Sequence, residues 1–400
     1  MSNVSTQIIT MYSKHSQYFD PDTSYITSLL SISVLIGSMV GSMSVSVLLT
    51  KLSKKTVVIS ASFVACALNI AQVFPVSWIY LFIMRILFGI PSSIITTIGP
   101  SWLAELCEDS KRGIITTLYQ VFVTFGIVIS SLILLAIGSD DKIWYISFIP
   151  PSIFTFCVGI CFCFFDNQPA QEQESNNTWE NFFQLKYKKV IINAFLFGVA
   201  QQGTGVNAVV IYATQIFART FSDDPNDYYS AIYGSMLISI VNFLATCLAI
   251  PLIQKINRRT LWFGGFIVCM IAHVMLIIQY TAIKNDILLI VSSIIFLVGF
   301  EIGPGPVFYV LCGETFPKSI KDKANTIAFT MNWTFNIFTV LIFPFLTEWV
   351  AYVLYLALTL IPVFIIWFTI PETKNKTLKQ IEVEMIYGEL QQEDIMSEYN

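Results

Sequence analysis

Eleven long apolar segments constrain the fold of this chain more than any other feature. They lie near 26–50, 56–75, 79–103, 114–138, 143–165, 190–217, 229–253, 261–281, 287–311, 325–347 and 350–370. A membrane-spanning helix needs about 20 mostly apolar residues, and these segments supply that length. Only 12% of the residues are charged and the mean hydropathy is +0.69, whereas soluble domains carry about 25% charged residues. The pattern predicts an all-α, multi-pass membrane protein and excludes a soluble globular enzyme.

Lysine and arginine residues are distributed unequally between the loops. Most of the 22 lie in one set of alternate loops, in stretches such as KLSKK (51–55), SKRG (110–113) and INRR (256–259). Cytoplasmic loops of membrane proteins carry this excess of positive charge. The sequence therefore predicts a cytoplasmic linker at 166–189, a cytoplasmic tail at 371–400 and an extracellular segment at 1–25.

Two short charged motifs recur at an interval of about 205 residues. KLSKK corresponds to KINRR (255–259), and the glutamate of AELCEDSKRG corresponds to the glutamate of GETFPKSIKDKA. This repeat predicts two related helical halves, with five spans in 26–165 and six in 190–370. A helix matching 190–217 would have to precede residue 1, so we expect the first helix of a twelve-helix arrangement to be absent from this chain.

The stretch QQGTGVN places three amides, Gln201, Gln202 and Asn207, inside an otherwise apolar span. Unpaired amides are unfavourable in hydrocarbon, so these side chains must face polar groups. A regular helix would spread them around its circumference, but a break at Gly203 and Gly205 could turn all three toward one cavity. The alternative is that they bond neighbouring helices together.

Further amides lie in other spans. NWTFN sets Asn332 and Asn336 four residues apart, hence on one helix face, beside Trp333. Two amides and a flat ring suit a pyranose sugar, since amides both donate and accept hydrogen bonds, but the same residues could serve helix packing. Gln120 and Asn242 are single amides in apolar helices, which taken alone favours contacts between helices.

Glu301 is the only carboxylate near the middle of a predicted span. Such a residue indicates a functional site, although it could also pair with backbone or with a cation. It precedes GPGP (303–306), which prevents a regular helix and supplies a bend. The eight cysteines show no CxxC spacing and the only histidines are His15 and His273, so no metal site, cofactor or catalytic constellation is indicated.

The chain carries a series of motifs in a fixed order: RILFG (85–89), PSWLAE (100–105), KRG (111–113), QQGTGVN (201–207), INRR (256–259), EIGPGP (301–306), GETFP (313–317), NWTFN (332–336) and PETKNKT (371–377). In their order and spacing they resemble the sugar porter family of the major facilitator superfamily, which includes the facilitative glucose transporters. The resemblance implies the major facilitator fold with two pseudo-repeated helical halves.

The resemblance also implies roles for individual residues. It implies a sugar site lined by Gln120, Gln201, Gln202, Asn207, Asn242, Phe300, Glu301, Asn332, Trp333 and Asn336. It implies that Tyr212 helps to close the outer side, and that Tyr309 fills a position where the family commonly has tryptophan. It further implies that cytoplasmic ion pairs between the halves form an inner gate from Arg85, Glu105, Arg112, Arg258, Arg259, Glu314 and Lys321.

We therefore expect this chain to move a monosaccharide, a hexose such as glucose, by alternating access and as facilitated diffusion. We expect a multi-pass protein of the plasma membrane with no enzymatic activity, no cofactor, no nucleic acid and no obligatory protein partner. Proton-coupled symport stays open, because the family's coupling carboxylate lies in the first helix, near the arginine that Arg85 matches. A sugar sensor that does not transport also stays open, although the tail after residue 370 is short for one.

Overall fold

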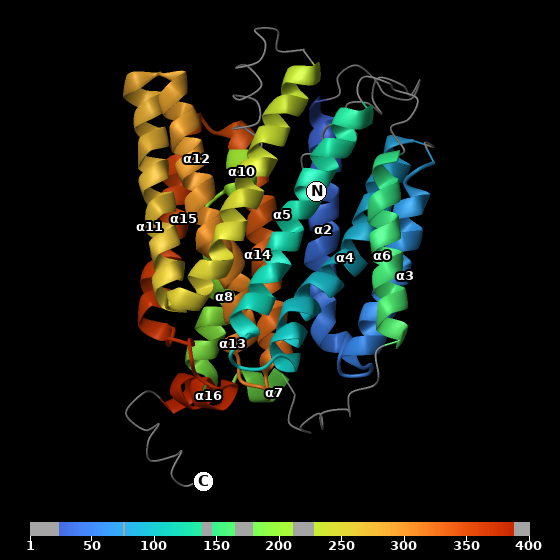
Figure 1. Ribbon diagram of the computed structural model, residues 1–400, viewed down its shortest axis with the longest axis vertical. Helices are drawn as coiled ribbons and strands as arrows, with labels where there is room; N and C mark the ends of the chain where they lie inside the picture. Colours follow the sequence, from blue (N-terminus) through green and yellow to red (C-terminus); the bar gives the residue numbers. More distant parts are fainter. Residues whose placement is uncertain (1–23, 75–76, 138–145, 165–178, 211–227, 388–400) are drawn as a thin grey trace.

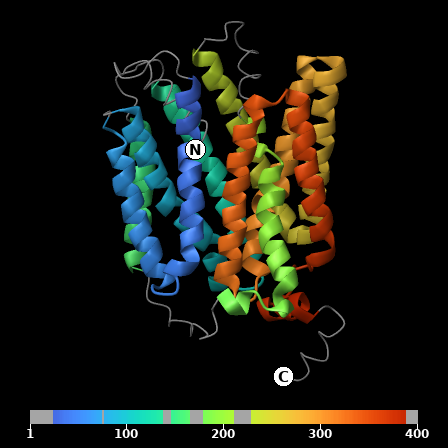
Figure 2. The same cartoon turned by 180° about the vertical axis from the view of Figure 1, so that it is seen from behind.

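The computed structural model describes residues 24–74, 77–137, 146–164, 179–210 and 228–387, and these ranges form an all-helical bundle. The long helices run side by side along one direction (Figures 1 and 2). The helices are α2 (Ser24–Leu48), α3 (Lys54–Ala71), α4 (Trp78–Leu106), α5 (Arg112–Ile137), α6 (Ile149–Phe164), α7 (Trp179–Phe182), α8 (Lys188–Gly203), α10 (Tyr228–Lys255), α11 (Arg258–Ile278), α12 (Asp286–Ile302), α13 (Pro304–Glu314), α14 (Lys321–Ile342), α15 (Glu348–Thr369) and α16 (Leu378–Tyr387).

Within the described ranges, ten helical stretches are long and apolar enough to cross a membrane. The expectation of eleven differs at 190–217, where α8 has only 16 residues and ends at Gly203. Residues 211–227 lie outside the described part of the chain. Helices α12 and α13 together form one crossing, Ile287–Glu314, with a bend at Gly303.

Several helices begin at capping residues that the sequence supplies. Ser53 accepts a hydrogen bond from the backbone N–H of Thr56 at the start of α3, and Ser77 accepts one from Tyr80 at the start of α4. These side-chain oxygens satisfy backbone donors that have no partner inside the helix. The caps thus fix where two of the membrane crossings start.

Small residues allow α2 and α4 to pack closely. A Cβ atom added to Gly37 would lie 1.9 Å from the carbonyl oxygen of Ile86, and one added to Gly41 would lie 2.2 Å from that of Ile90. The spacing of these two glycines is the small-xxx-small pattern that brings membrane helices together. Larger side chains at either position would push the two helices apart.

Helices α2 to α6 pack against one another, as do α8 and α10 to α15. In Figure 1, α3 and α6 lie on one flank and α11 and α12 on the other. The two groups meet where α2 packs on α14, α5 packs on α10, and α13 packs on α4 and α5. Hydroxyl pairs cross this boundary at Ser42–Thr330 (3.2 Å) and Ser131–Ser239 (2.9 Å). The expected domain limits stay predictions; residues 1–23, 165–178 and 388–400 lie outside the described ranges.

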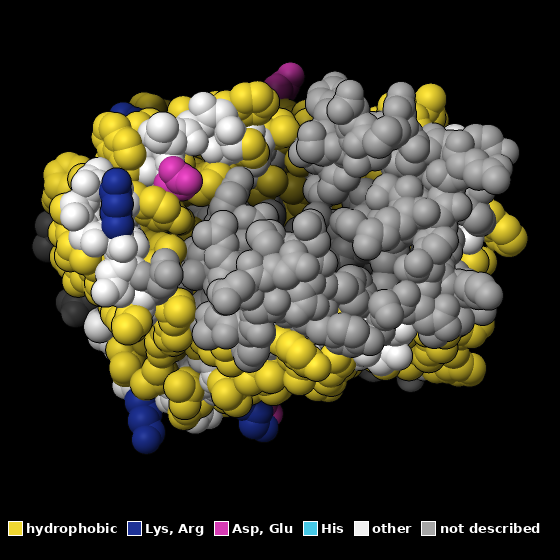
Figure 3. Space-filling view, turned by 90° about the horizontal axis from the view of Figure 1, so that it is seen from above, with side chains coloured by type: hydrophobic (Ala, Val, Ile, Leu, Met, Phe, Trp, Pro, Cys, Tyr) yellow, Lys and Arg dark blue, Asp and Glu magenta, His cyan; other side chains and the backbone are white. Residues whose placement is uncertain are grey.

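The outer surface of the bundle is apolar. Large exposed side chains include Phe122 at 67%, Phe154 at 59% and Phe364 at 65% exposure. Figure 3 shows hydrophobic side chains around the rim of one end of the bundle. Apolar surface of this extent indicates contact with lipid. At the opposite end lie α7 and α16 (Figure 1); we call it the basic end, because α3, α5, α11 and α14 begin there with Lys54, Arg112, Arg258 and Lys321.

Candidate functional site

Helix α8 breaks in the middle of the bundle, as the glycines of QQGTGVN led us to expect. The helix ends at Gly203, and Gly205 adopts φ +67°, in the left-handed region. A Cβ atom on Gly205 would lie 2.5 Å from the ring of Tyr355, so both the backbone conformation and the space require glycine. Helical structure resumes at Val206.

Four amides meet at this break, and we call them the amide cluster: Gln201, Gln202, Asn207 and Asn332. The Asn332 amide nitrogen, from α14, donates to the side-chain oxygen of Gln201. Gln202 Nε2 donates to Asn332 Oδ1 at 3.4 Å, and Asn207 Nδ2 donates to Gln202 Oε1 at 3.2 Å. Gln201 and Gln202 still belong to α8, and the break brings Asn207, which lies beyond it, to Gln202. All three amides of the motif therefore join one network.

The amide cluster is attached to the second broken helix. Gln201 Nε2 donates to the carbonyl oxygens of Pro304 and Gly305 at 3.1 and 3.2 Å. These carbonyls belong to the start of α13, just after the bend at Gly303. The Gln201 side chain thus connects two irregular backbone segments, the break after α8 and the bend before α13. Irregular backbone is tolerated at membrane depth when it is buried in protein in this way.

Glu301 lies next to the amide cluster and is bound by neutral donors. Gln120 Nε2, from α5, and Thr246 Oγ1, from α10, each donate to Glu301 Oε2 at 3.0 Å. Gly305 lies beside the same carboxylate oxygen, since a Cβ atom added to it would be 3.0 Å away. The carbonyl of Gly305 also accepts from Gln201, so this residue connects Glu301 to the amide cluster. Polar groups from both sides of the bundle converge here, and all but Asn207 are buried.

Three other predicted site residues carry hydrogen-bonding capacity that the described residues do not use. Asn242 Oδ1, Trp333 Nε1 and Asn336 Oδ1 are buried and have no hydrogen-bond partner among the residues that the structure describes. Buried polar atoms are nearly always paired in proteins, so these atoms are candidates for contact with a polar ligand or with water. Phe300 differs from them: it is buried and its ring stacks on Phe296, with centroids 6.3 Å apart.

Aromatic rings cross the boundary between the two groups of helices below the site. The rings of Tyr119 in α5 and Tyr309 in α13 lie 4.6 Å apart, and Phe329 of α14 lies 6.0 Å from Tyr309. Tyr309 therefore contacts the opposite helix group, as a gating ring would. Tyr212 lies outside the described residues.

The basic end is closed by an ionic cluster that we call the gate cluster: Lys54, Glu105, Lys321 and Asp322. Lys54 Nζ lies 2.8 Å from Glu105 Oε2 and 3.5 Å from Asp322 Oδ1, and Lys321 Nζ lies 3.3 Å from Glu105 Oε1. Lys54 and Glu105 belong to α3 and α4, whereas Lys321 and Asp322 begin α14. The Glu105–Lys321 and Lys54–Asp322 pairs thus join the two groups of helices.

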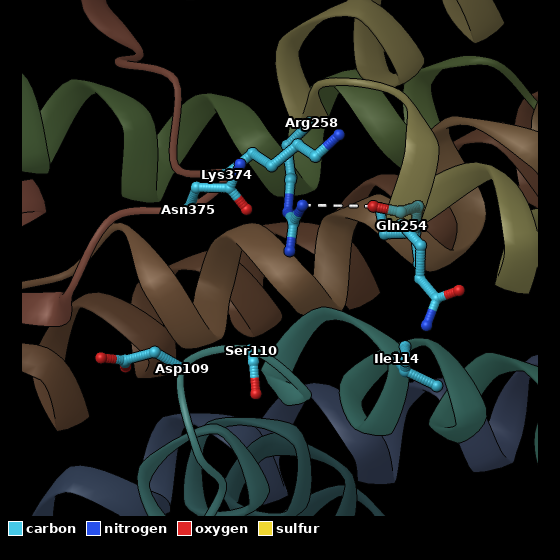
Figure 4. A pocket seen from close by; sticks show the side chains of 8 residues that line it. Asp109, Ser110, Ile114, Gln254, Arg258, Lys374 and Asn375 are labelled. Carbon is cyan, nitrogen blue, oxygen red and sulfur yellow. Dashed lines mark hydrogen bonds between the residues drawn. The ribbon is translucent and has the colours of Figure 1, made fainter.

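A second ionic group surrounds Glu314. Arg258 Nε lies 3.7 Å from Glu314 Oε2 within the same helix group, and Thr373 Oγ1 donates to that oxygen at 2.6 Å. Arg112, from α5, attracts Glu314 across the boundary and also pairs with Asp109 of its own loop. Beside this group, Asp109 and Ser110 on one side face Arg258, Gln254 and the segment 374–375 on the other, around a cavity of about 170 Å³ (Figure 4).

Two predicted gate arginines have other environments. Arg85 lies near the start of α4, far from the basic end, where its Nε donates to Leu30 O at 3.0 Å and Ser33 Oγ at 3.2 Å. The expectation of a cytoplasmic ion pair was therefore wrong for Arg85, because α4 reaches the basic end only at its other terminus. Arg259 donates to Trp367 O at 2.8 Å and lies 5.1 Å from the Trp367 ring centroid. Both contacts lie within one helix group.

Sequence reasoning missed several residues that the structure brings into these groups. Thr246 binds Glu301, and its only signal is its position one helical turn after Asn242. Lys54 and Asp322 join the gate cluster from the ends of charged loops. Glu372 accepts from the backbone N–H groups of the first two residues of α11, each at 3.0 Å, a role that PETKNKT does not reveal by itself.

Comparisons with known proteins agree on one family. The sequence matches the profile described as "Sugar (and other) transporter" over residues 1–170 and 165–385. The chain belongs to this sugar transporter family. It is 25% identical over 418 residues to solute carrier family 2, facilitated glucose transporter member 3 of Ovis aries, covering 90% of this chain and 83% of that protein. It is 27% identical over 396 residues to the glucose transporter GlcP of Staphylococcus epidermidis, covering 88% and 87%.

A solved structure of another transporter defines the fold. The proton:xylose symporter XylE, bound to 6-bromo-6-deoxy-D-glucose, matches with a TM-score of 0.80 at 18% identity over 95% of both chains. The sugar transporter family member described here thus has the major facilitator fold and is a multi-pass integral membrane protein. Its family membership supports the expectation that it is not an enzyme.

Proposed function

We propose that this protein transports a monosaccharide, a hexose such as glucose, by alternating access and as facilitated diffusion. The observation that carries the proposal is the convergence of amide side chains and one carboxylate, from two broken helices and the opposite helix group, on one buried region. Gln201, Gln202, Asn332, Gln120 and Glu301 are each held by another polar group of this region. Such groups can exchange their mutual hydrogen bonds for bonds to sugar hydroxyls.

The chemistry of the region suits an uncharged polyol. Amides donate and accept, and the Glu301 carboxylate can accept from two hydroxyl groups. The unpartnered Asn242 Oδ1, Trp333 Nε1 and Asn336 Oδ1 add two acceptors and one donor. A ligand that lacks a matching hydroxyl would leave buried polar groups unpaired, which is the strongest available source of discrimination between similar sugars.

Alternating access needs a gate that breaks and re-forms. The Glu105–Lys321 and Lys54–Asp322 pairs join the two helix groups at the basic end, which supports a conformation closed on that side. Opening of the basic end would break these ion pairs and expose their charges to water. Contacts formed as the opposite end closes would compensate for the lost pairs. The sugar biases the two-state equilibrium only through its different affinity for the two states.

The basic end would face the cytoplasm, with the C-terminus on that side, and the plasma membrane is the site of action that we propose. The excess of lysine and arginine in one set of loops supports this orientation. Relatives that are named as glucose transporters, GlcP among them, support a hexose as substrate.

Proton-coupled symport is the second candidate, favoured by one observation. The described partners of Glu301 are the neutral side chains of Gln120 and Thr246, so a proton on this carboxylate would not break an ion pair. The matching structure of a proton:xylose symporter is consistent with this alternative. Coupling would let the cell accumulate sugar above its external concentration, whereas facilitated diffusion only equalises the two concentrations.

The test is uptake of radiolabelled hexoses and pentoses in a cell that lacks its own sugar transporters, with and without a proton uncoupler. Facilitated diffusion predicts saturable uptake that equilibrates and does not respond to the uncoupler. Accumulation that the uncoupler abolishes would establish symport instead. Binding of sugar by the purified protein without uptake would establish a sensor, and neither binding nor uptake of any sugar would overturn the proposal.

Single substitutions test the site assignment in the same assay. Gln202→Ala and Glu301→Ala should each raise KM roughly five- to thirtyfold, because one buried hydrogen bond to a hydroxyl contributes on the order of 1–2 kcal/mol. The control is Asn69→Ala, which removes another buried amide whose Nδ2 binds Phe148 O at 2.8 Å and Ser152 Oγ at 2.9 Å far from the site. Unchanged KM in both site variants, at equal surface abundance, would refute the assignment.

A further inference from the structure

The break in α8 exposes carbonyl groups that a continuous helix would have satisfied. Each must find another donor, since buried backbone carbonyls are almost always hydrogen-bonded. Thr204 Oγ1 donates to Gln201 O at 2.6 Å, and the Gly205 N–H donates to Gln202 O at 2.9 Å. Both bonds are local and come from the break itself.

The carbonyl of Thr204 is satisfied from a different helix. His273 Nε2, in the middle of α11, lies 3.1 Å from Thr204 O. Because a carbonyl can only accept, Nε2 must carry the proton. This bond ties α11 to Thr204, which lies between the end of α8 and the left-handed Gly205.

The surroundings of His273 are otherwise apolar and aromatic. The side chain is completely buried, and its ring lies 5.0 Å from the ring of Phe296, 6.1 Å from Tyr352 and 6.3 Å from Tyr355. The second ring nitrogen, Nδ1, is buried without a partner among the described residues. A histidine held by a single bond in such a place is unfavourable for packing alone, because an apolar ring would fill the space without desolvating an imidazole.

Tyr355 supports the same break from the other side. Its ring covers Gly205 so closely that any Cβ there would clash, and its hydroxyl donates to Thr339 O of α14 at 2.7 Å. The break is thus enclosed between His273 of α11 and Tyr355 of α15. Gln201, Gln202 and Asn207 lie within three residues of the carbonyl that His273 holds.

We propose that His273 is a positioning residue of the sugar site, which fixes the Thr204 carbonyl and thereby the break that aims the amide cluster. The proposal rests on the proposed function. His273 does not touch the substrate; it holds the break in the conformation in which Asn207 meets Gln202, which in turn binds Asn332. Without its bond, the competent conformation becomes a fraction of the population, and the apparent affinity for sugar falls by that fraction.

Three substitutions separate positioning from packing. His273→Gln places an amide N–H where Nε2 lies, His273→Asn carries the same amide one carbon atom short of the Thr204 carbonyl, and His273→Phe keeps a ring among the aromatic neighbours without a donor. We would measure equilibrium binding of radiolabelled D-glucose to the purified full chain, KM and kcat of uptake, and thermal stability.

Positioning predicts that His273→Gln binds D-glucose within about threefold of wild type, while His273→Asn and His273→Phe bind about tenfold more weakly, with the loss in KM rather than in kcat. Wild-type affinity in His273→Phe would overturn the proposal, as would equal losses in all three variants. Failure of the unmodified protein to bind or carry any sugar is a different result, which overturns the proposed function before the variants are compared.

A measurement on the wild-type protein keeps the proposal testable if a variant does not fold. The sequence contains only two histidines, so ¹⁵N NMR of histidine-labelled protein resolves them. We expect one ring with a slowly exchanging Nε2–H and an unprotonated Nδ1. A buried histidine protonated only at Nδ1 could not donate to Thr204 and would overturn the proposal.

Discussion

Neutralising Glu105 should open the basic end. In the gate cluster the Glu105 side chain is 12% exposed and the Lys321 side chain is 3% exposed, so their attraction is poorly screened. Removing one partner of a buried ion pair destabilises a structure by about 3–5 kcal/mol. Because Lys54 is 23% exposed and retains Asp322, we expect a smaller effect for Glu105→Gln, of about 2–3 kcal/mol, or roughly 30- to 150-fold in the closed-to-open equilibrium.

The assay uses a thiol that only the open conformation exposes. Thr116 of α5 is completely buried, and its methyl carbon lies 3.8 Å from the Cβ position of Gly313 in the opposite helix group. In a Thr116→Cys background, the alkylation rate at that position, followed by peptide mass spectrometry to separate it from the native cysteines, reports the open population. Glu105→Gln should raise this rate roughly 30- to 150-fold.

Glu108→Gln is the matched control for the gate prediction. It removes the same charge three residues further along the chain, but its side chain is 72% exposed and pairs with Lys111 in the same helix group. Exposed pairs contribute little, so the alkylation rate should stay within twofold of the background. If Glu105→Gln behaves like Glu108→Gln, the gate cluster does not hold the basic end closed.

Two further predictions concern stability, measured by thermal unfolding in detergent. Gly205→Ala forces a side chain into the left-handed region and against Tyr355, and should destabilise the protein by at least about 1–2 kcal/mol. The control is Gly264→Ala, whose Cβ would meet nothing within 4 Å and which should be neutral or stabilising. Equal effects of the two substitutions would contradict the assignment of strain to Gly205. Glu372→Ala removes both side-chain bonds to the start of α11 and should lower the free energy of unfolding by about 1–2 kcal/mol. The control is Glu348→Ala, at an exposed position in the first turn of α15, which should change the stability little. A larger loss for Glu348→Ala than for Glu372→Ala would count against the cap.

The fold was predictable because lipid imposes a simple rule. Each crossing must be a helix of about 20 apolar residues, and the family model and the XylE structure confirm the family and the fold class. The break in α8 was also predictable, since glycines between polar residues are a local signal for irregular backbone in a span. What hydropathy could not show is that α8 stops after 16 residues.

The partners of the site residues were much less predictable. Periodicity indicates which residues share a helix face, as for Asn332 and Asn336, but not how two helices are rotated against each other. The bonds from Gln201 to Pro304 O and Gly305 O depend on that rotation. His273 and Thr246 were missed for a related reason, because a single polar residue in a span has no pattern from which a role could be inferred.

The family resemblance was a similarly incomplete guide at the basic end. It implied Glu105, Lys321, Arg258 and Glu314 as gate residues, but it did not imply Lys54 or Asp322 and gave no pairings. The structure selects Lys54 and Lys321 for Glu105, and Arg258 for Glu314. The position of Arg85 was misjudged because its place in the motif order says nothing about its depth in α4.

The segment that follows α15 links the end of the chain to the helices beside the gate. Glu372 caps α11, Thr373 binds Glu314, and Lys374 Nζ reaches Lys255 O at 2.8 Å. A purification tag or fluorescent reporter joined at Pro371 would therefore detach three anchors at once and alter the very motion it was meant to report. For this protein the fusion junction belongs beyond Tyr387, after the whole of α16.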